Sequence, residues 1–192
     1  MSYFNAIYST EEARNNAFYD GSTFGNRFLD SDILLNTMEV DLLKNPLSAY
    51  YDEVAEYFRS IIGKNPNWDY LYRYVLAVFD VIRTKCLISE NLTPAYKKGD
   101  REKLGEICDV LLPKYLEHLE EMNEAHYAHK DKYLRPFGIE ITDKWYGDKK
   151  QRAKTAIRRI RAYLNGSISS IAELDDLKLA YRGGPIEVRN NG

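Results

Sequence analysis

RPFGIEITDKWYGDKKQR, residues 135–152, is the stretch around which the chain is organised. Pro136 lacks the amide hydrogen that a helix interior needs, and Gly138 weakens helix continuation, so any helix that reaches this stretch is interrupted. Apolar residues then alternate with polar residues or glycine from Phe137 to Ile141, which is the period of an extended strand-like segment. We therefore predict an irregular, extended segment at about residues 135–148.

Outside this stretch, apolar residues recur three and four positions apart, the spacing of helices with one buried face. The sequence predicts an all-α fold, a bundle or array of about four long helices plus short ones. Four long helices are expected: from Asn45-Pro46 to Gly63, from Asn67 to a point before or beyond Pro94, from Asp100 through a kink at Pro113, and over residues 153–164. Short helices are expected over residues 9–20 and 171–177. One helical turn is expected at residues 33–35.

Composition places the chain among compact globular proteins and narrows its partners. Its 192 residues are enough for one domain, 1–192, with residues 1–8 and 184–192 expected to be loosely attached. The net charge of -2 gives no reason to expect nucleic acid or a membrane surface as a partner. Cys86 and Cys108 lie on apolar helical stripes, which predicts buried free thiols in a reducing, cytoplasmic compartment.

Two histidines provide the strongest hint of metal chemistry. His126 and His129 are three residues apart on an expected helix, with Glu121 and Glu124 nearby, and such spacing can hold a metal. The segment has no third strong ligand at a fixed offset and is polar on all sides. A solvated helix face is therefore the preferred interpretation, and we expect neither a metal nor a cofactor.

Two charged patterns have similar structural explanations. The adjacent carboxylates Asp52 and Glu53 resemble the acid pairs of glycoside chemistry, but they lie on the solvent side of a regular helix near its beginning, where the helix dipole favours acids. Eight basic residues lie between 144 and 161. With only Trp145 and Tyr146 as interleaved aromatics, they are a weak signal for nucleic-acid binding.

The stretch from Arg135 to Asp148, followed by Gln151-Arg152, resembles part of the C-terminal helical domain in one branch of glycoside hydrolase family 20, the bacterial exo-acting β-N-acetylhexosaminidases. Further matches follow in the family's order and extend the resemblance over about residues 24–184. They are Asn45-Pro46 with Tyr50 and Asp52, Ala95-Tyr96 with Gly99-Asp100, and residues 161–166 with 171–174 and Tyr181.

The chain departs from the family pattern at three places. The family's tryptophan before Pro-Phe-Gly has no clear equivalent, although Tyr127 or Tyr133 lies near its position. Lys144-Trp145 stands where the family has an arginine, and Asp148 replaces one glycine of a pair. These changes weaken the transfer of a substrate contact to this turn.

The resemblance implies that the chemistry lies elsewhere, in a (β/α)₈ barrel. There an Asp-Glu pair at the end of a barrel strand would assist attack by the substrate's own N-acetyl group, so Asp52-Glu53 is not that pair. We expect that barrel to precede Met1 in the natural polypeptide, and this chain alone to be inactive. The resemblance also implies that this domain packs on its own catalytic barrel and supports a homodimer of the parent enzyme.

The stretch then supplies the candidates for a substrate or interface contact, with no catalytic residue among them. They are Arg135, Glu140, Asp143, Trp145, Tyr146 and Arg152. A purely structural alternative pairs Arg152 with Asp143 and places Trp145 in a domain interface. Two other functions remain open: a free-standing helical module that binds another protein, and a small metalloenzyme that uses His126 and His129.

Overall fold

The computed structural model describes residues 28–44, 46–133 and 138–178, and every regular element in these ranges is helical. The predictions for residues 1–8, 9–20 and 184–192 lie outside them. The elements are α4 (Glu39–Lys44), α5 (Ser48–Ile61), α6 (Asp69–Lys98), α7 (Arg101–Glu106), the π-helical turn η1 (Ile107–Leu111), α8 (Leu112–Tyr133), α9 (Ile139–Leu164) and α10 (Ala172–Asp175). The predicted all-α class with four long helices is confirmed.

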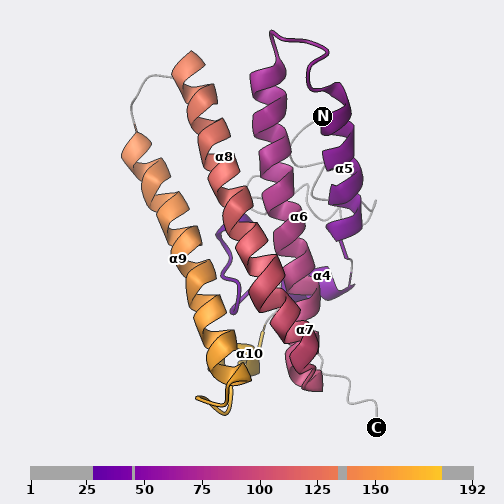
Figure 1. Ribbon diagram of the computed structural model, residues 1–192, viewed down its shortest axis with the longest axis vertical. Helices are drawn as coiled ribbons and strands as arrows, with labels where there is room; N and C mark the ends of the chain where they lie inside the picture. Colours follow the sequence, from indigo (N-terminus) through magenta and orange to yellow (C-terminus); the bar gives the residue numbers. More distant parts are fainter. Residues whose placement is uncertain (1–27, 45, 134–137, 179–192) are drawn as a thin grey trace.

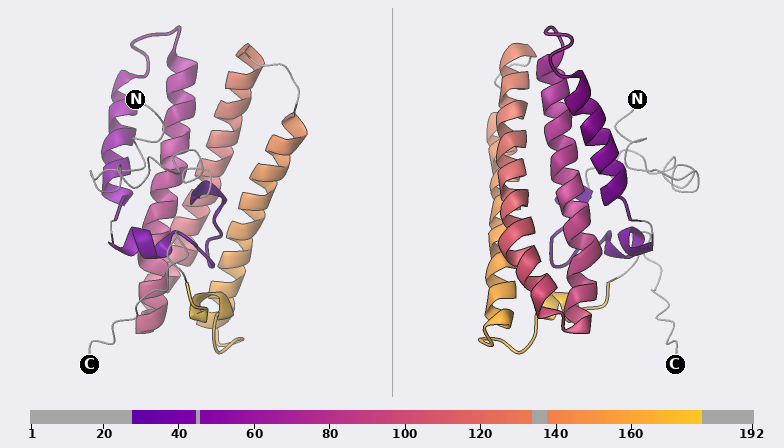
Figure 2. Two further views of the ribbon diagram at one scale, coloured as in Figure 1. Left: turned by 180° about the vertical axis from the view of Figure 1, so that it is seen from behind. Right: turned by 45° about the vertical axis from the view of Figure 1, so that its right-hand side comes forward.

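The four long helices form an up-and-down row in the order α9, α8, α6, α5 (Figure 1). Neighbours in the chain are therefore neighbours in space, as short connections require. Residues 28–44, including α4, cross one face of this row (Figure 2). Their buried residues, such as Phe28, Leu34 and Met38, join the core of the helices, so one face of the row is covered by chain from the same domain.

The beginning of α5 is fixed by a residue from another helix. Asn45 lies outside the described residues, and the helix begins at Ser48, later than predicted. The carboxylate of Glu90 on α6 accepts hydrogen bonds from the backbone N–H groups of Leu47 and Ser48, at 2.8 and 3.0 Å, and from the Ser48 hydroxyl at 2.6 Å. Glu90 thus accepts hydrogen bonds from the free N–H groups at the start of α5, a role that a side chain just before the helix normally fills.

Helix α6 runs through Pro94 to Lys98, which settles the alternative left open by the sequence. Gly99, in the left-handed region at φ 68°, ends it. Asp100 then caps α7 through a hydrogen bond from the backbone N–H of Lys103, as predicted. The predicted cap at Asn67 is wrong, because Trp68 precedes the first residue of α6 and no side chain caps it.

The third predicted helix is continuous in direction but divided by a π-helical turn. The N–H of Leu112 bonds to the carbonyl of Ile107, five residues back. This wider turn stands directly before Pro113, whose missing N–H and bulky ring disturb the α-helical ladder. The irregularity predicted at Pro113 therefore takes the form of a π turn.

The largest correction concerns residues 139–148, which are helical rather than extended. Helix α9 begins at Ile139 and continues to Leu164, so the helix predicted over 153–164 is only its second half. Tyr146, Lys149, Ala153, Ala156 and Ile160 are buried at helical spacing. This long buried stripe outweighs the short two-residue alternation between Phe137 and Ile141. Gly138, at φ 81°, precedes the helix in the left-handed region that glycine adopts easily.

Smaller predictions had mixed outcomes. Residues 33–35 form a bend, and the short helix of this region is α4. The prediction of a short helix within 171–177 is confirmed by α10. Cys86 and Cys108 are buried and free, as expected. In the described part of the chain, no helix is long and apolar enough to cross a membrane.

Candidate functional site

Five of the six candidate residues lie on α9, and the sixth, Arg135, lies outside the described residues. The helix separates them by face. Tyr146 is buried, Trp145 and Arg152 are partly buried, and Glu140 and Asp143 are exposed. The set is therefore divided between residues that face the domain and residues that face away from it.

Trp145 is held by a carboxylate that lies far away in the sequence. Its indole Nε1 donates to Oδ1 of Asp30, 115 residues earlier. The ammonium of Lys149, one helical turn after Trp145, lies 3.2 Å from the same Oδ1 and 2.9 Å from a carboxylate oxygen of Asp148. Asp30 thus connects α9 to the segment that crosses the helical row.

Arg152 forms the second connection to that segment. Its Nε and one terminal nitrogen donate to the two carboxylate oxygens of Asp32, at 2.8 and 2.5 Å. Burial alone would raise the pKa of Asp32, but the bonds from Arg152 and from the backbone N–H groups of Leu35 and Ile33 hold that pKa below its usual value. The two parallel hydrogen bonds fix both the orientation of the Arg152 guanidinium and its distance from the Asp32 carboxylate.

The alternative partner suggested by the sequence, Asp143, is wrong for Arg152. Asp143 lies more than two turns earlier on α9 and accepts a hydrogen bond from the hydroxyl of Tyr127 on α8. The neighbouring residue, Thr142, accepts a hydrogen bond from Lys130 at 2.5 Å. These contacts join the beginning of α9 to the end of α8.

A cavity of about 540 Å³ lies beside Trp145, between α6, α8 and α9. Tyr74, Trp145 and Tyr146 supply aromatic walls. Aliphatic side chains and three polar residues complete the lining; they are Leu29, Val75, Val78, Met122 and Ile141, with Asp30, Thr142 and His126. This is the size and the mainly apolar character of small-molecule sites.

A family model described as the Glycoside Hydrolase 20C C-terminal domain matches residues 5–190. This match spans nearly the whole chain and agrees with the resemblance read from residues 135–152. The chain belongs to this family. No curated protein sequence matches it.

In this 20C C-terminal domain, His126 and His129 are part of an aromatic stack. Tyr70, His129, Tyr74 and His126 follow one another between α6 and α8, with successive ring centroids 5.6, 5.6 and 5.1 Å apart. Burial, with the positive charge of Lys130 and then His129, lowers the pKa of His126, which favours its neutral form. Among the described residues, no group of three or more His, Cys, Asp or Glu side chains could hold a metal.

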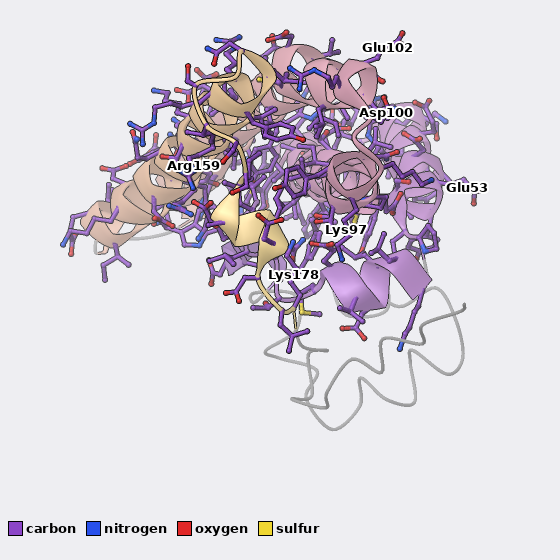
Figure 3. The ribbon with its side chains drawn as sticks, turned by 90° about the horizontal axis from the view of Figure 1, so that it is seen from below. Glu53, Lys97, Asp100, Glu102, Arg159 and Lys178 are labelled. Carbon is purple, nitrogen blue, oxygen red and sulfur yellow. The ribbon has the colours of Figure 1, made fainter. Side chains whose placement is uncertain are left out.

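The other charged patterns of the 20C domain are largely internal ion pairs. Asp52 is bound to Arg83 on α6 at 2.6 Å, while Glu53 points away from the core on the outer side of α5 (Figure 3). Of the basic residues on α9, five are paired with acids: Lys149, Lys150, Arg152, Arg159 and Arg161.

A functional-looking residue that the sequence interpretation missed is Lys85 on α6. Its side chain is fully buried, and Nζ donates to the carbonyl oxygens of Phe28, Leu29 and Ser31 at 2.6, 2.9 and 2.5 Å. Burial and the nearby charge of Lys149 lower its pKa to about 7. Its position three residues after Ile82, on the apolar stripe of α6, was the signal that could have identified it.

The lower end of the domain is closed by α10. Figure 3 shows Arg159 of α9 and Lys178 on either side of this short helix. Arg159 donates to Glu173 at 2.7 Å, and Lys178 pairs with the buried Glu39 of α4. None of these residues belongs to the cavity, so this end serves to fasten the chain after α9.

Proposed function

We propose that this chain is the non-catalytic C-terminal domain of a β-N-acetylhexosaminidase that releases terminal N-acetylhexosamine units from glycans. The observation that carries the proposal is the family match over residues 5–190, in a chain whose regular elements, in the described part, are all helices. The parent enzyme would work in a reducing, cytoplasmic compartment, in keeping with the buried free thiols of Cys86 and Cys108.

The positions of Asp52 and Glu53 support a non-catalytic role. They lie on α5, and Asp52 is held by Arg83. The chemistry of family 20 uses an Asp-Glu pair at the end of a barrel strand, where one carboxylic acid donates a proton to the leaving group. That pair belongs to the catalytic (β/α)₈ barrel, which is the first partner that we assign to this domain.

The exposed beginning of α9 is the surface that fits such a partner best. Ile141 is 67% exposed there, and Glu140, Lys144 and Gly147 are exposed as well. Gly147 occupies an ordinary helical position, where glycine costs up to about 1 kcal/mol relative to alanine. A methyl group added at Gly147 would meet nothing within 4 Å in this domain. Close approach of another protein surface to the α9 backbone would explain why glycine, rather than a residue with a side chain, occupies position 147.

The proposal places this surface against the barrel, near an active-site entrance, in a homodimeric parent enzyme. Glu140, Asp143 and Ile141 would then contact the barrel, while Trp145 and Arg152 keep α9 in place through Asp30 and Asp32. A free-standing interaction module would also use this face, but its partner would not be a sugar-cleaving barrel.

An association experiment separates these two functions. The chain and the catalytic barrel of a family 20C enzyme from the same organism are produced separately and mixed. The proposal predicts a complex in size-exclusion chromatography, and an increase in the melting temperature of the barrel. Absence of both, at concentrations of about 100 μM of each protein, would contradict it, since even weak interdomain contacts of standard size give measurable binding in this range.

A further inference from the structure

The cavity beside Trp145 has a small set of polar groups placed in otherwise apolar walls. The rings of Trp145 and Tyr146 lie 4.9 Å apart at 89°, so they form a corner. Tyr74 adds another aromatic surface, and Ile141 lies exposed at the edge of the cavity. A ligand that fits here needs an apolar surface, because it must cover aromatic and aliphatic walls.

The charges around the cavity favour a neutral ligand. The carboxylate of Asp30 is balanced by the ammonium of Lys149, 3.2 Å away. His126 stacks on Tyr74, and its Nδ1 lies 3.4 Å from the Tyr146 hydroxyl. Because its pKa is lowered, His126 adds little positive charge at neutral pH. Neither a cation nor an anion would find an unbalanced opposite charge.

One acceptor in this lining remains available to a ligand. Within the described part of the chain, Trp145 and Lys149 both reach Oδ1 of Asp30, and no contact is made to Oδ2. The Asp30 side chain is 50% exposed and lines the cavity. A hydroxyl or amide N–H of the ligand could donate to Oδ2, and bonds to a charged acceptor are the stronger ones.

We infer that this cavity binds a neutral saccharide unit, an N-acetylhexosamine, with the apolar face of the sugar on the partly exposed rings of Trp145 and Tyr74 and a hydroxyl or amide group donating to Asp30. A pyranose ring combines a C–H face with hydroxyl donors and carries no charge. The choice of the N-acetylated sugar rests on the proposed function. The lining of the cavity by itself favours a neutral ligand with an apolar face and a hydrogen-bond donor.

Intrinsic fluorescence gives a direct test, since the chain has two tryptophans. Trp68→Phe removes the one that precedes α6 and leaves Trp145 as the only reporter. Titration of this variant with N-acetylglucosamine and its β-1,4-linked disaccharide should change the emission of Trp145 saturably, with a Kd on the order of 1 mM. Glucosamine, which carries a positive charge, should bind more weakly.

Two further variants show whether binding occurs in the cavity. Asp30→Asn, in the Trp68→Phe background, keeps one oxygen for Trp145 and should weaken sugar binding about tenfold. The matched control Asp52→Asn changes a carboxylate on α5 and should leave the affinity unchanged. Val75→Phe fills the cavity and should abolish binding, with circular dichroism confirming that the helices remain.

Three results would overturn the inference. The first is no saturable change with either sugar. The second is equal affinity of the Asp30→Asn and Asp52→Asn variants, and the third is tighter binding of glucosamine than of N-acetylglucosamine. Failure here is distinguishable from failure of the proposed function, because association of the domain with the barrel is measured separately and without sugar.

Discussion

Lys85 is the most constrained single residue of the domain. Its ammonium is buried among three carbonyl oxygens of residues 28–31, and its neighbourhood contains Lys149, Asp30 and Asp32. The arrangement ties α6 to the segment that also holds Trp145 and Arg152. The apolar stripe of α6 singles out Lys85, but a sequence pattern cannot identify its acceptors, because they are backbone atoms more than fifty positions away.

The lowered pKa of Lys85 predicts a specific dependence of stability on pH. The folded pKa is about 7, and the ordinary pKa of lysine is 10.5, so between these values the unfolded chain binds more protons. The free energy of unfolding should therefore gain up to about 1.4 kcal/mol per pH unit from this group as the pH rises from 7 to 10. Urea unfolding at several pH values measures it.

Lys85→Met is the matching variant. It should lose this pH-dependent gain and should be less stable at every pH, because three buried carbonyls lose their donor. An unchanged slope in Lys85→Met between pH 7 and 10 would show that Lys85 titrates normally.

The pair of Arg152 and Asp32 gives a pH dependence of the same sign, but in the acidic range. The folded pKa of Asp32 is lowered, so its stabilisation is present above the unfolded pKa and is lost as the pH falls through the folded value. Arg152→Gln should lower the free energy of unfolding by about 1–3 kcal/mol at pH 7. The difference from the wild type should shrink at pH 3 or below.

Arg158→Gln is the control for this pair, since Arg158 is exposed on the same helix. Its effect should stay within about 0.5 kcal/mol. A similar loss in both variants would mean that helix charge, rather than the bidentate contact, is responsible.

At the level of elements, the sequence predicted helices well and helix ends less well. Residues 68–86 carry a long apolar stripe, and α6 follows it past Pro94. The short alternation around Ile139 and Ile141 predicts an extended segment, but these residues are helical. The helical spacing of the buried residues Tyr146, Lys149 and Ala153 is the stronger pattern. Strong helix formers such as Glu140 and Lys144 were the signal available against that reading.

The cap of α5 shows why the ends are harder to predict. Glu90 reaches the first N–H groups of α5 from the middle of α6. Glu90→Ala should lower the free energy of unfolding by about 1–2 kcal/mol. Amide hydrogen exchange should increase mainly in the first turn of α5. Glu53→Ala, an exposed change on α5 itself, is the control; equal exchange in both variants would contradict the cap.

Gly147 and Gly105 form a second matched pair at this scale. Both are helical, and an added methyl group meets nothing within 4 Å at either. Each change to alanine should increase the free energy of unfolding of the domain by up to about 1 kcal/mol. The melting temperature should rise accordingly. Only Gly147→Ala should weaken association with the catalytic barrel. Equal association of the two variants would remove α9 from the proposed interface.

For the whole molecule, an up-and-down row of helices follows from apolar spacing and short connections. The crossing of residues 28–44 over that row does not follow from these two features of the sequence. The contacts that organise the candidate site join Asp30 to Trp145 and Asp32 to Arg152, across 115 and 120 residues. Local patterns identified the right helix for the site but could not identify these partners, because each carboxylate stands in a segment of ambiguous structure.

The central claim is that the chain is a non-catalytic domain of a family 20 enzyme. The most direct measurement is hydrolysis of a chromogenic N-acetylglucosaminide by the purified chain, beside a barrel-containing family 20C enzyme at the same molar concentration. The account predicts no saturable turnover by the chain alone and normal turnover by the enzyme. Saturable turnover by the chain, reduced in the Asp52→Asn or Glu53→Gln variant, would contradict it.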